Sequence, residues 1–334
     1  MTVLVTGGAG YIGMHTVAEL VAHGEPVVVV DDLSTGHWPP GLFDVPFYQL
    51  DIQDAEAVGV VMARHGVDAV VHFAAKSLVG ESVQDPLLYY ERNVAATAQL
   101  LRAMVRQGVR RMVFSSTAAV YGHPDRVPIR EDDAKQPVNP YGETKLAIER
   151  MLHWCGAAYG LSSISLRYFN AAGAHPERPI GEDHRPETHL IPIVLQVALG
   201  QRDTVTIFGS DYDTPDGTCV RDYIHVMDLA SAHRLALERL RRGEAGVEAY
   251  NLGTGSGHSV LEVVRIARAV TGHPIPVVHG PRRAGDPAVL VASPARAEAI
   301  LGWRPRYTGM EAMVETAWRW HKSHPEGFGA AGGP

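Results

Sequence analysis

The chain has 334 residues, of which 46% are hydrophobic, and it carries a formal net charge of -7 with a pI of about 6.2. This length allows one large core or two smaller ones. The acidic balance argues against a nucleic-acid surface or a polybasic membrane contact. No apolar run approaches the length that spans a bilayer, and the N-terminus shows no leader pattern, so we expect a cytoplasmic protein with no membrane partner.

Cysteine and histidine usage gives no sign of a metal site. Cys155 and Cys219 are the only cysteines, and they form no C-x-x-C pair. We expect both to be reduced thiols, as is usual in the cytosol. The 17 histidines are scattered without a ligand spacing such as H-E-x-x-H, so we predict no metal.

The first half of the chain alternates apolar runs with amphipathic stretches. Residues 3–5 are predicted to form a strand, which a glycine turn joins to a helix that ends near residue 23. Further strands are predicted at residues 26–31, 47–52, 68–73, 111–115 and 163–169, and helices at 54–65, 86–107 and 141–158. Alternating strands and helices predict an α/β fold with a Rossmann-type, doubly wound parallel sheet.

After Asn170 the pattern changes. Residues 171–190 are polar, rich in Pro, Gly and His, and have no clear period. Shorter elements follow: helices at 192–199, 227–240, 259–270, 294–301 and 310–322, and strands at 204–208 and 249–252. We predict a cofactor-binding domain over residues 1–170. A smaller mixed substrate lobe should cover 171–325, with some segments returning to the first domain, and 326–334 should be a flexible tail.

Three glycines, Gly7, Gly10 and Gly13, follow the first predicted strand and open a helix. Their G-x-x-G-x-x-G spacing is related to the dinucleotide-binding fingerprint. Glycine lets the backbone approach a pyrophosphate closely, and the helix N-terminus presents free N–H groups to it. We therefore predict a dinucleotide cofactor at this turn.

Asp31 closes the second predicted strand, followed by Asp32, at the distance expected of a ribose-binding acid. A carboxylate there accepts hydrogen bonds from the adenosine ribose and repels a 2′-phosphate, which favours NAD over NADP. Asp51 and Ile52 end the third predicted strand and are candidate adenine contacts. A solvent-exposed role for Asp51 remains nearly as plausible on the sequence alone.

Tyr141 and Lys145 lie one turn apart on the predicted helix. A nearby ammonium lowers the pKa of a phenol, so we expect Lys145 to bring Tyr141 toward the working pH as a base for an alcohol. A Tyr-x-x-x-Lys pair alone is a weak signal, because such pairs are common on solvated helices. Thr117 lies at the end of the fifth predicted strand and could be an ordinary strand-end hydroxyl. Because Tyr141 and Lys145 follow it in the chain, we predict instead that it bonds the reacting oxygen.

Several segments together resemble the extended short-chain dehydrogenase/reductase superfamily, namely Thr6-Gly7-Gly8-Ala9-Gly10-Tyr11-Ile12-Gly13, Ser115-Ser116-Thr117 and Tyr141-x-x-x-Lys145. Others are similar to its UDP-hexose 4-epimerase family: Gly80-Glu81-Ser82, Ala119–Gly122, Leu166–Asn170, Gly181-Glu182-Asp183, Val220–Val226, Tyr250–Gly253 and Pro281–Asp286. The resemblance runs from Thr2 to about Pro325.

This resemblance implies a catalytic base at Tyr141, its electrostatic partner at Lys145 and a sugar-binding hydroxyl at Thr117. The implied cofactor contacts are Gly7, Gly10, Tyr11, Ile12, Gly13, Asp31, Asp32, Asp51, Ile52, Phe73, Ala74, Ala75, Asn93, Ser115, Tyr141, Lys145 and Phe169. The implied UDP-sugar contacts are Thr117, Tyr141, Asn170, His189, Leu190, Phe208, Arg221, Arg283, Asp286 and Leu290. A surface ion pair for either arginine, and core packing for Phe208, remain open from the residues alone.

The resemblance also implies an activity, the reversible 4-epimerisation of UDP-glucose and UDP-galactose through a 4-ketone with tightly bound NAD, in a homodimer. One rival is a nucleotide-sugar 4,6-dehydratase, which needs an acid and a base beside the ketone. Ala118-Ala119 follow Thr117 where such enzymes carry an Asp-Glu pair. A decarboxylase or a plain dehydrogenase fits the C-terminal segments less well. A non-catalytic NAD(H)-binding regulator typically lacks the Tyr/Lys pair.

Three positions depart from the family pattern. The family's cofactor lysine aligns with Ser77, and Lys76 lies one place away, so that ribose contact is left open. A substrate-contacting Asn aligns with His189, and a bulky Tyr beside the sugar C2 group aligns with Leu290 if Asp286 fixes the register. The smaller Leu290 suggests that UDP-N-acetylglucosamine is also turned over.

Overall fold

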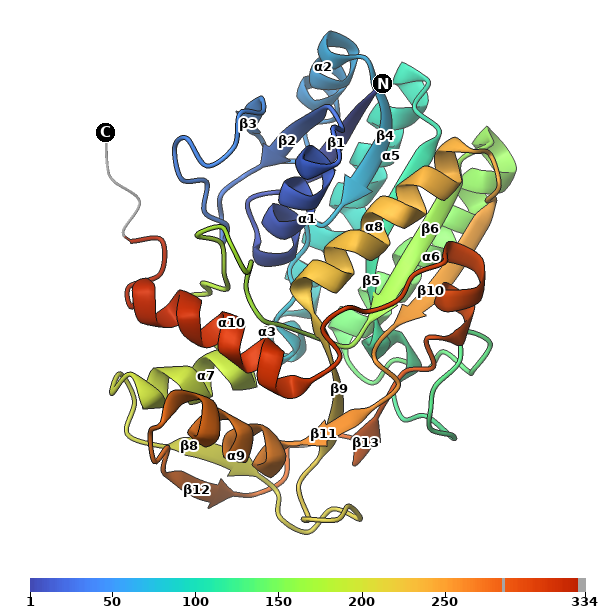
Figure 1. The fold of residues 1–334 in the computed structure, drawn as a ribbon. Coiled ribbons are helices and arrows are strands. Elements are labelled where there is room, and N and C mark those ends of the chain that lie inside the picture. The colour runs from blue at the N-terminus through green and yellow to red at the C-terminus, as the bar shows by residue number, and fades with distance from the viewer. Residues whose placement is uncertain (284–285, 330–334) are drawn as a thin grey trace.

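The computed structural model of the protein describes residues 1–283 and 286–329. Its larger part is built on a seven-stranded sheet in which every neighbouring pair is parallel (Figure 1). In sheet order the strands are β10 (Val247–Leu252), β6 (Ser162–Tyr168), β5 (Arg111–Thr117), β4 (Val67–His72), β1 (Thr2–Thr6), β2 (Val27–Asp31) and β3 (Phe47–Gln49). The predicted Rossmann-type α/β fold is confirmed.

Helices cover both faces of this sheet. One face carries α1 (Tyr11–Ala22) and α8 (Val226–Arg241), which pack against each other. The other carries α2 (Ala55–His65), α5 (Ala96–Gln107) and α6 (Pro140–Tyr159), and Figure 1 shows α1 and α8 in front of the strands. Alternate residues of β1 explain this layering, because Val3 and Val5 join the core under α1 and α8, whereas Leu4 joins the core under α2 and α5.

Short helical segments extend the second face. They are α3 (Val79–Gln84), α4 (Pro86–Tyr89), a π-helical turn, η1 (Tyr90–Ala95), that runs into α5, and a 3₁₀ turn, η2 (Ala118–Tyr121), after β5. The predicted helix over 86–107 is therefore present but not uniform. The helix α3 was not predicted, because its few residues show no helical period. The predicted strand over 47–52 ends at Gln49.

The remaining chain forms a smaller lobe below the sheet. Its strands are β7 (Asn170–Ala172), β8 (Val205–Phe208), β9 (Val220–His225), β11 (Gly257–Ser259), β12 (Val277–Gly280) and β13 (Val289–Leu290). Its helices are α7 (Leu190–Ala198), α9 (Val260–Thr271) and α10 (Met310–Ser323). The core of the lobe lies between α7, α9 and α10.

Three elements after residue 170 belong to the sheet rather than to the lobe: α8, β10 and the π-helical turn η3 (Ala297–Leu301), which packs against both of them. Helix α8 covers its front face, and β10 pairs in register with β6 along six residues. The chain therefore crosses between the two parts several times, which is visible in Figure 1 where β9 runs up to α8 and β11 runs in the opposite direction into the lobe. A boundary at residue 170 therefore divides the two parts only until α8 begins at Val226, because later segments of the chain belong to both parts.

The strand β9, which the sequence analysis did not predict, is the centre of the lobe's connection to the sheet. It pairs with β7, β11 and β13. The buried carboxylate of Asp222 accepts hydrogen bonds from the backbone N–H groups of Thr254, Gly255 and Ala292 at 2.9, 3.2 and 3.1 Å. The adjacent charged residues Arg221 and Asp222 hid the strand, because Asp222 is buried only by these tertiary contacts.

The C-terminal segment differs from the flexible tail expected for 326–334. Phe328 packs against Trp320 with a ring-centroid distance of 4.8 Å. Its backbone N–H donates to Asp183 at 2.9 Å. Residues 326–329 are therefore fixed to the body, and residues 330–334 lie outside the described residues.

A buried polar network joins the catalytic half of the sheet to β10. The guanidinium of Arg167 donates to both carboxylate oxygens of Glu149, at 2.9 and 2.5 Å, and to the hydroxyl of Tyr121 at 2.9 Å. Tyr121 then donates to Asn251 of β10 at 2.6 Å. Each buried polar group thus has a partner, which is the condition for burying charge at all.

We expect Arg167→Leu to lower the free energy of unfolding by about 3–5 kcal/mol, because Glu149 would be left as an unpaired buried carboxylate. Denaturant unfolding measures this change. Arg150→Leu is the matched control, since its pair with Glu143 has a spacing of 3.6 Å and is exposed. The control should cost less than about 1 kcal/mol, and equal losses in the two variants would contradict the burial argument.

Candidate active site

The N-terminus of α6 forms where the sequence predicted the catalytic pair. The Asn139 side chain accepts a hydrogen bond from the Gly142 N–H at 2.9 Å, and Pro140 occupies the first helical turn. A Cβ on Gly142 would lie 2.6 Å from the Ala119 carbonyl oxygen. The missing side chain therefore lets α6 approach the end of β5 closely.

Lys145 is held beneath Tyr141 and is only 3% exposed. Its Nζ donates to the carbonyl oxygen of Ser115 at 2.9 Å and lies 5.0 Å from the Phe114 ring centroid. It also lies 5.9 Å from the Tyr141 ring centroid. Burial without a carboxylate partner lowers the pKa of Lys145 to about 7.

Tyr141 faces the end of β5, where Thr117 is buried. Burial raises the pKa of Tyr141 above its usual value, and a hydrogen bond with Thr117 opposes this rise. The expectation that Lys145 by itself brings the pKa of Tyr141 toward neutrality is therefore wrong for the protein alone. The reason is that burial of the Tyr141 phenol, the largest cause, disfavours its charged form.

The glycine turn leaves a cradle at the end of β1. Gly7 has a positive φ of 72°, and a Cβ on it would lie 2.4 Å from the backbone N of Ala74. A Cβ on Gly13 would lie 2.1 Å from the Gly7 carbonyl oxygen. The turn follows β1, which lies between β2 and β4 in the sheet. The strand order reverses between β1 and β4, and doubly wound sheets bind nucleotides in the crevice at such a switch point. The residues present fit a dinucleotide.

Asp31 is tied into this cradle. Its Oδ2 accepts a hydrogen bond from the Ala9 N–H and its Oδ1 one from the Leu33 N–H, both at 2.9 Å. Asp32 instead caps the Ser34 N–H at 2.9 Å and is exposed. The carboxylate of Asp31 is therefore the one that the fold fixes beside the turn.

Other predicted cofactor residues line the same edge with varied local roles. Asp51 pairs with Arg92 at 2.8 Å, and Ile52 is buried in the core behind the sheet. Tyr11 begins α1, and its hydroxyl donates to the Gly173 carbonyl at 2.6 Å. Ile12 packs against the core under α1. Tyr11 thus links the glycine turn to the loop after β7.

Asn93 supports the loop after β4, which carries Phe73, Ala74 and Ala75. Its side chain accepts from the Lys76 N–H at 2.8 Å and donates to the Lys76 carbonyl and the Thr144 hydroxyl, both at 3.1 Å. This buried amide therefore ties the loop to the turn of α6 that holds Lys145. Ser115 shares a short hydrogen bond with Tyr168, and Phe169 follows at the end of β6.

The predicted phosphate-binding arginines come from two parts of the lobe. Arg221, in β9, donates to the carbonyls of Val220 and Pro287 at 2.9 Å and lies 3.5 Å from Asp286. The Arg283 guanidinium lies 4.1 Å from the ring centroid of Phe208. Ala284 and Gly285, between these partners in sequence, lie outside the described residues.

The lobe brings Leu290 to the catalytic side. Leu290 pairs in register with Arg221 and packs with Phe169 on a small core of Val120, Tyr121, Ile129 and Leu146. Asn170 pairs with Tyr223 at the start of β7, and Leu190 begins α7 directly after His189. Sequence reasoning missed Glu149 and Arg167, although Arg167 lies inside a quoted family segment.

We predict that Lys145→Met changes the pH dependence of stability in the cofactor-free protein. Folding depresses the pKa of Lys145 below its unfolded value of about 10.4, so the unfolded chain binds more protons between about pH 7 and 10. Wild-type stability relative to the variant should therefore rise across this window, by up to about 1.4 kcal/mol per pH unit. Urea unfolding of both proteins measures the difference, and a difference that is constant with pH would refute it.

Comparisons with known proteins agree with this geometry. Residues 3–253 match the NAD dependent epimerase/dehydratase family. The chain is 60% identical over 329 residues to the UDP-glucose 4-epimerase of Halalkalibacterium halodurans, with 98% of each chain covered.

Two solved structures share the fold. The Bifidobacterium longum UDP-glucose 4-epimerase in complex with NAD+ and UDP is 41% identical, with a TM-score of 0.93 and 98% and 100% coverage of this chain and that chain. The UDP-Glc/GlcNAc 4-epimerase of Campylobacter jejuni is 39% identical, with a TM-score of 0.84 and 96% and 99% coverage. The chain therefore belongs to the NAD dependent epimerase/dehydratase family, and its relatives are UDP-glucose 4-epimerases.

Proposed function

We infer that this protein interconverts UDP-glucose and UDP-galactose at C4, as an NAD-dependent isomerase. The supporting observation is the convergence of Tyr141, Lys145 and Thr117 at the end of β5, beside the glycine cradle at the end of β1. The family supports the same reaction and the same cofactor. Ala118 and Ala119 follow Thr117, so a 4,6-dehydratase would lack the acid and the base that elimination of water requires.

Epimerisation at C4 requires oxidation first, because the C4–H bond of a sugar alcohol is not acidic. When bound, oxidised NAD would supply the hydride acceptor. Loss of the 4′-hydroxyl proton to the protein, together with loss of the C4 hydride to that acceptor, would give a flat 4-ketone. Return of hydride to the opposite face inverts the centre, with no net redox change.

Tyr141 serves this sequence in both directions. It takes the hydroxyl proton during oxidation and gives it back during reduction. Thr117 can bond the sugar oxygen in either pose, because a hydroxyl both donates and accepts. Lys145 would hold the nicotinamide ribose and, in its protonated form, would stabilise the phenolate electrostatically.

The sugar must turn while the UDP moiety stays bound. Arg221 and Arg283 suit this task, since a guanidinium binds phosphate oxygens with two parallel hydrogen bonds. Arg221 is already fixed by backbone carbonyls, whereas Arg283 rests on Phe208. We assign NAD binding chiefly to residues 1–170 and UDP-sugar binding chiefly to 171–325.

We expect Tyr141→Phe to lower kcat by several orders of magnitude while UDP-sugar binding weakens only modestly, because the base is lost but the diphosphate contacts remain. Conversion of UDP-galactose to UDP-glucose without added reductant measures the rate, and calorimetry with UDP measures binding. Near-normal turnover would refute the role of Tyr141. No turnover by the wild-type protein would instead favour the NAD(H)-binding regulator.

We propose that the site also accepts UDP-N-acetylglucosamine. Leu290 packs beside Phe169 where a bulky Tyr is expected in the family, which leaves space at the sugar C2 group. We expect Leu290→Tyr to lower kcat/KM for UDP-N-acetylglucosamine by about 10- to 200-fold. The rate with UDP-glucose is the internal control and should change little. A wild-type protein that strongly rejects the N-acetyl sugar would contradict this.

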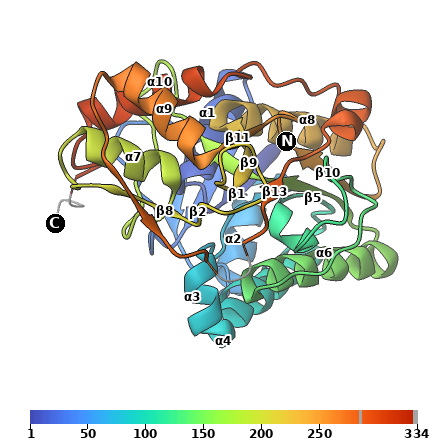
Figure 2. The same cartoon turned by 90° about the horizontal axis from the view of Figure 1, so that it is seen from below.

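A homodimer is the expected assembly. Trp154 and Tyr159 of α6 are exposed, and so are Leu87 of α4 and Val83 of α3, which packs beside α6. Figure 2 shows α3, α4 and α6 along one side of the molecule. Exposed aromatic and aliphatic side chains gathered on neighbouring helices are typical of protein interfaces.

Light scattering with size-exclusion chromatography tests this assembly. Trp154→Glu and Leu87→Glu should convert the dimer to a monomer, because each would bury a charge in the interface. Val60→Glu changes an exposed residue of α2 and is the control. A dimer in all three variants would rule out this face.

Two observations bear on the cellular location. Cys155 and Cys219 are both free thiols, as expected in a reducing compartment. Among the described residues, no helix combines the length and apolar character needed to cross a bilayer. We place the reaction in the cytoplasm.

A further inference from the structure

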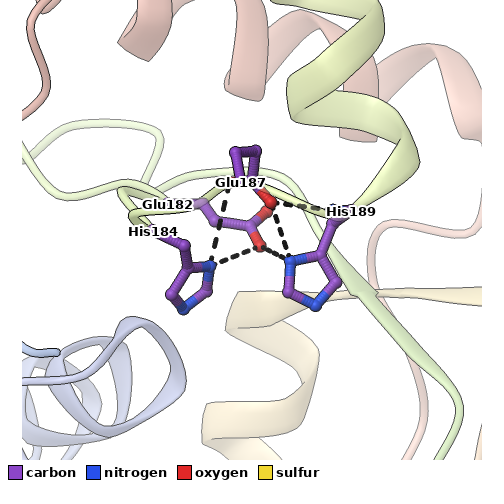
Figure 3. Close-up of side chains that lie close together, drawn as sticks. All are labelled: Glu182, His184, Glu187 and His189. Carbon is purple, nitrogen blue, oxygen red and sulfur yellow. Dashed lines mark hydrogen bonds and ion pairs between the residues drawn. The ribbon is translucent and has the colours of Figure 1, made fainter. Parts of the chain in front are cut away.

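A cluster of two histidines and two glutamates lies in the segment between β7 and α7. Glu182, His184, Glu187 and His189 each offer a ligand atom, and these atoms all lie within 4.8 Å of one another. Figure 3 shows both imidazole rings turning a nitrogen toward the two carboxylates. The sequence analysis assigned only His189 a role and predicted no metal.

The spacing within the cluster suits a small cation. His189 Nδ1 lies 2.9 Å from Glu182 Oε1 and 3.0 Å from Glu187 Oε1. His184 Nδ1 lies 3.1 Å from Glu182 Oε1 and 3.8 Å from Glu187 Oε2. Ligands at about 2.0–2.2 Å in a tetrahedron are about 3.3–3.6 Å apart. Three of the four distances are shorter than this range and one is longer, so the ligand atoms would have to shift by a few tenths of an ångström when an ion binds.

The two carboxylates need positive charge. Glu182 and Glu187 are both buried, at 6% and 9% exposure. Among the described residues, neither forms an ion pair with a lysine or an arginine. Arg185 lies within the same loop but pairs with Asp183 instead. Two buried carboxylates without a permanent cation are costly, and one divalent ion balances them.

The surroundings hold the ligands in place. Glu187 Oε1 accepts hydrogen bonds from the backbone N–H groups of Thr188 and His189 at 2.7 and 2.8 Å. The Glu182 carbonyl accepts from the Trp320 indole at 3.3 Å. Such outer contacts orient metal ligands. The histidines keep partial exposure, which leaves a route of entry for an ion.

We propose that Glu182, His184, Glu187 and His189 bind one divalent transition-metal ion of the zinc type. Imidazole and carboxylate ligands in a tetrahedral N₂O₂ set favour such an ion over Mg²⁺ or Ca²⁺, which prefer all-oxygen sites with more ligands. Residues 173–189 contain no helix or strand, and long irregular loops of this kind are usually functional. The ion fixes this loop.

The site also lies next to the cofactor cradle. The His184 ring lies edge-on to the Tyr11 ring, with centroids 6.3 Å apart, and Tyr11 directly follows the glycine turn. The ion therefore positions the loop against the first turn of α1. It also offsets the negative charge of Glu182 and Glu187 beside the turn that meets the pyrophosphate.

Metal analysis of the tag-free protein, loaded with Zn²⁺ and dialysed, tests this proposal independently of epimerase activity. We expect about one equivalent of zinc per chain. Glu187→Gln and His184→Asn should each weaken zinc binding, measured by calorimetry, by more than the roughly 10- to 100-fold typical of an outer-shell loss. The Co²⁺-substituted protein should show the visible absorption of a tetrahedral site.

His258→Asn is the matched control, because His258 forms a single histidine–glutamate pair with Glu262 at 3.1 Å outside the cluster. It should retain the full equivalent. Zinc well below one equivalent in the wild-type protein, or retention by both cluster variants, would overturn the proposal. Protonated histidines would then balance the carboxylates, and the proposed epimerase activity would be unaffected.

Discussion

The burial of Lys145 without a carboxylate partner is the constraint on which the catalytic region depends. Its ammonium meets one carbonyl oxygen, that of Ser115, and the faces of Phe114 and Tyr141. Such a site costs folding free energy, as the depressed pKa of Lys145 indicates. A carboxylate partner would reduce this cost. It would also neutralise the positive charge that Lys145 must present to a bound cofactor and to the phenol.

The surrounding structure offsets this cost by fixing everything nearby. Asn139 and Gly142 start α6 against β5, and Asn93 connects the next turn of α6 to the loop after β4. Behind them, Glu149 and Arg167 form a satisfied buried ion pair between α6 and β6. A phenol, a hydroxyl and an ammonium are thereby held on rigid elements, which is what precise proton transfer requires.

The lobe brings residues far apart in the sequence to this rigid edge. Arg221 and Leu290 become neighbours only because β13 pairs with β9. Glu182 to His189 become a cluster only because their loop folds back beside Tyr11 and Trp320. Their spacing follows no helical or strand period, so no regular element in the sequence signals it. For this reason the cluster matches no helical ligand spacing such as H-E-x-x-H.

The sequence by itself determined the sheet, the glycine turn, Asp31 and the Tyr141–Lys145 pair, because each depends on local pattern: hydrophobic period, glycine spacing and one helical turn. It could not give β9, whose Asp222 is buried only when the strand pairs with β7, β11 and β13. It also gave the wrong sign for the pKa of Tyr141. Charge spacing along a helix is local, but desolvation depends on every element packed around the group, and only the tertiary structure decided it.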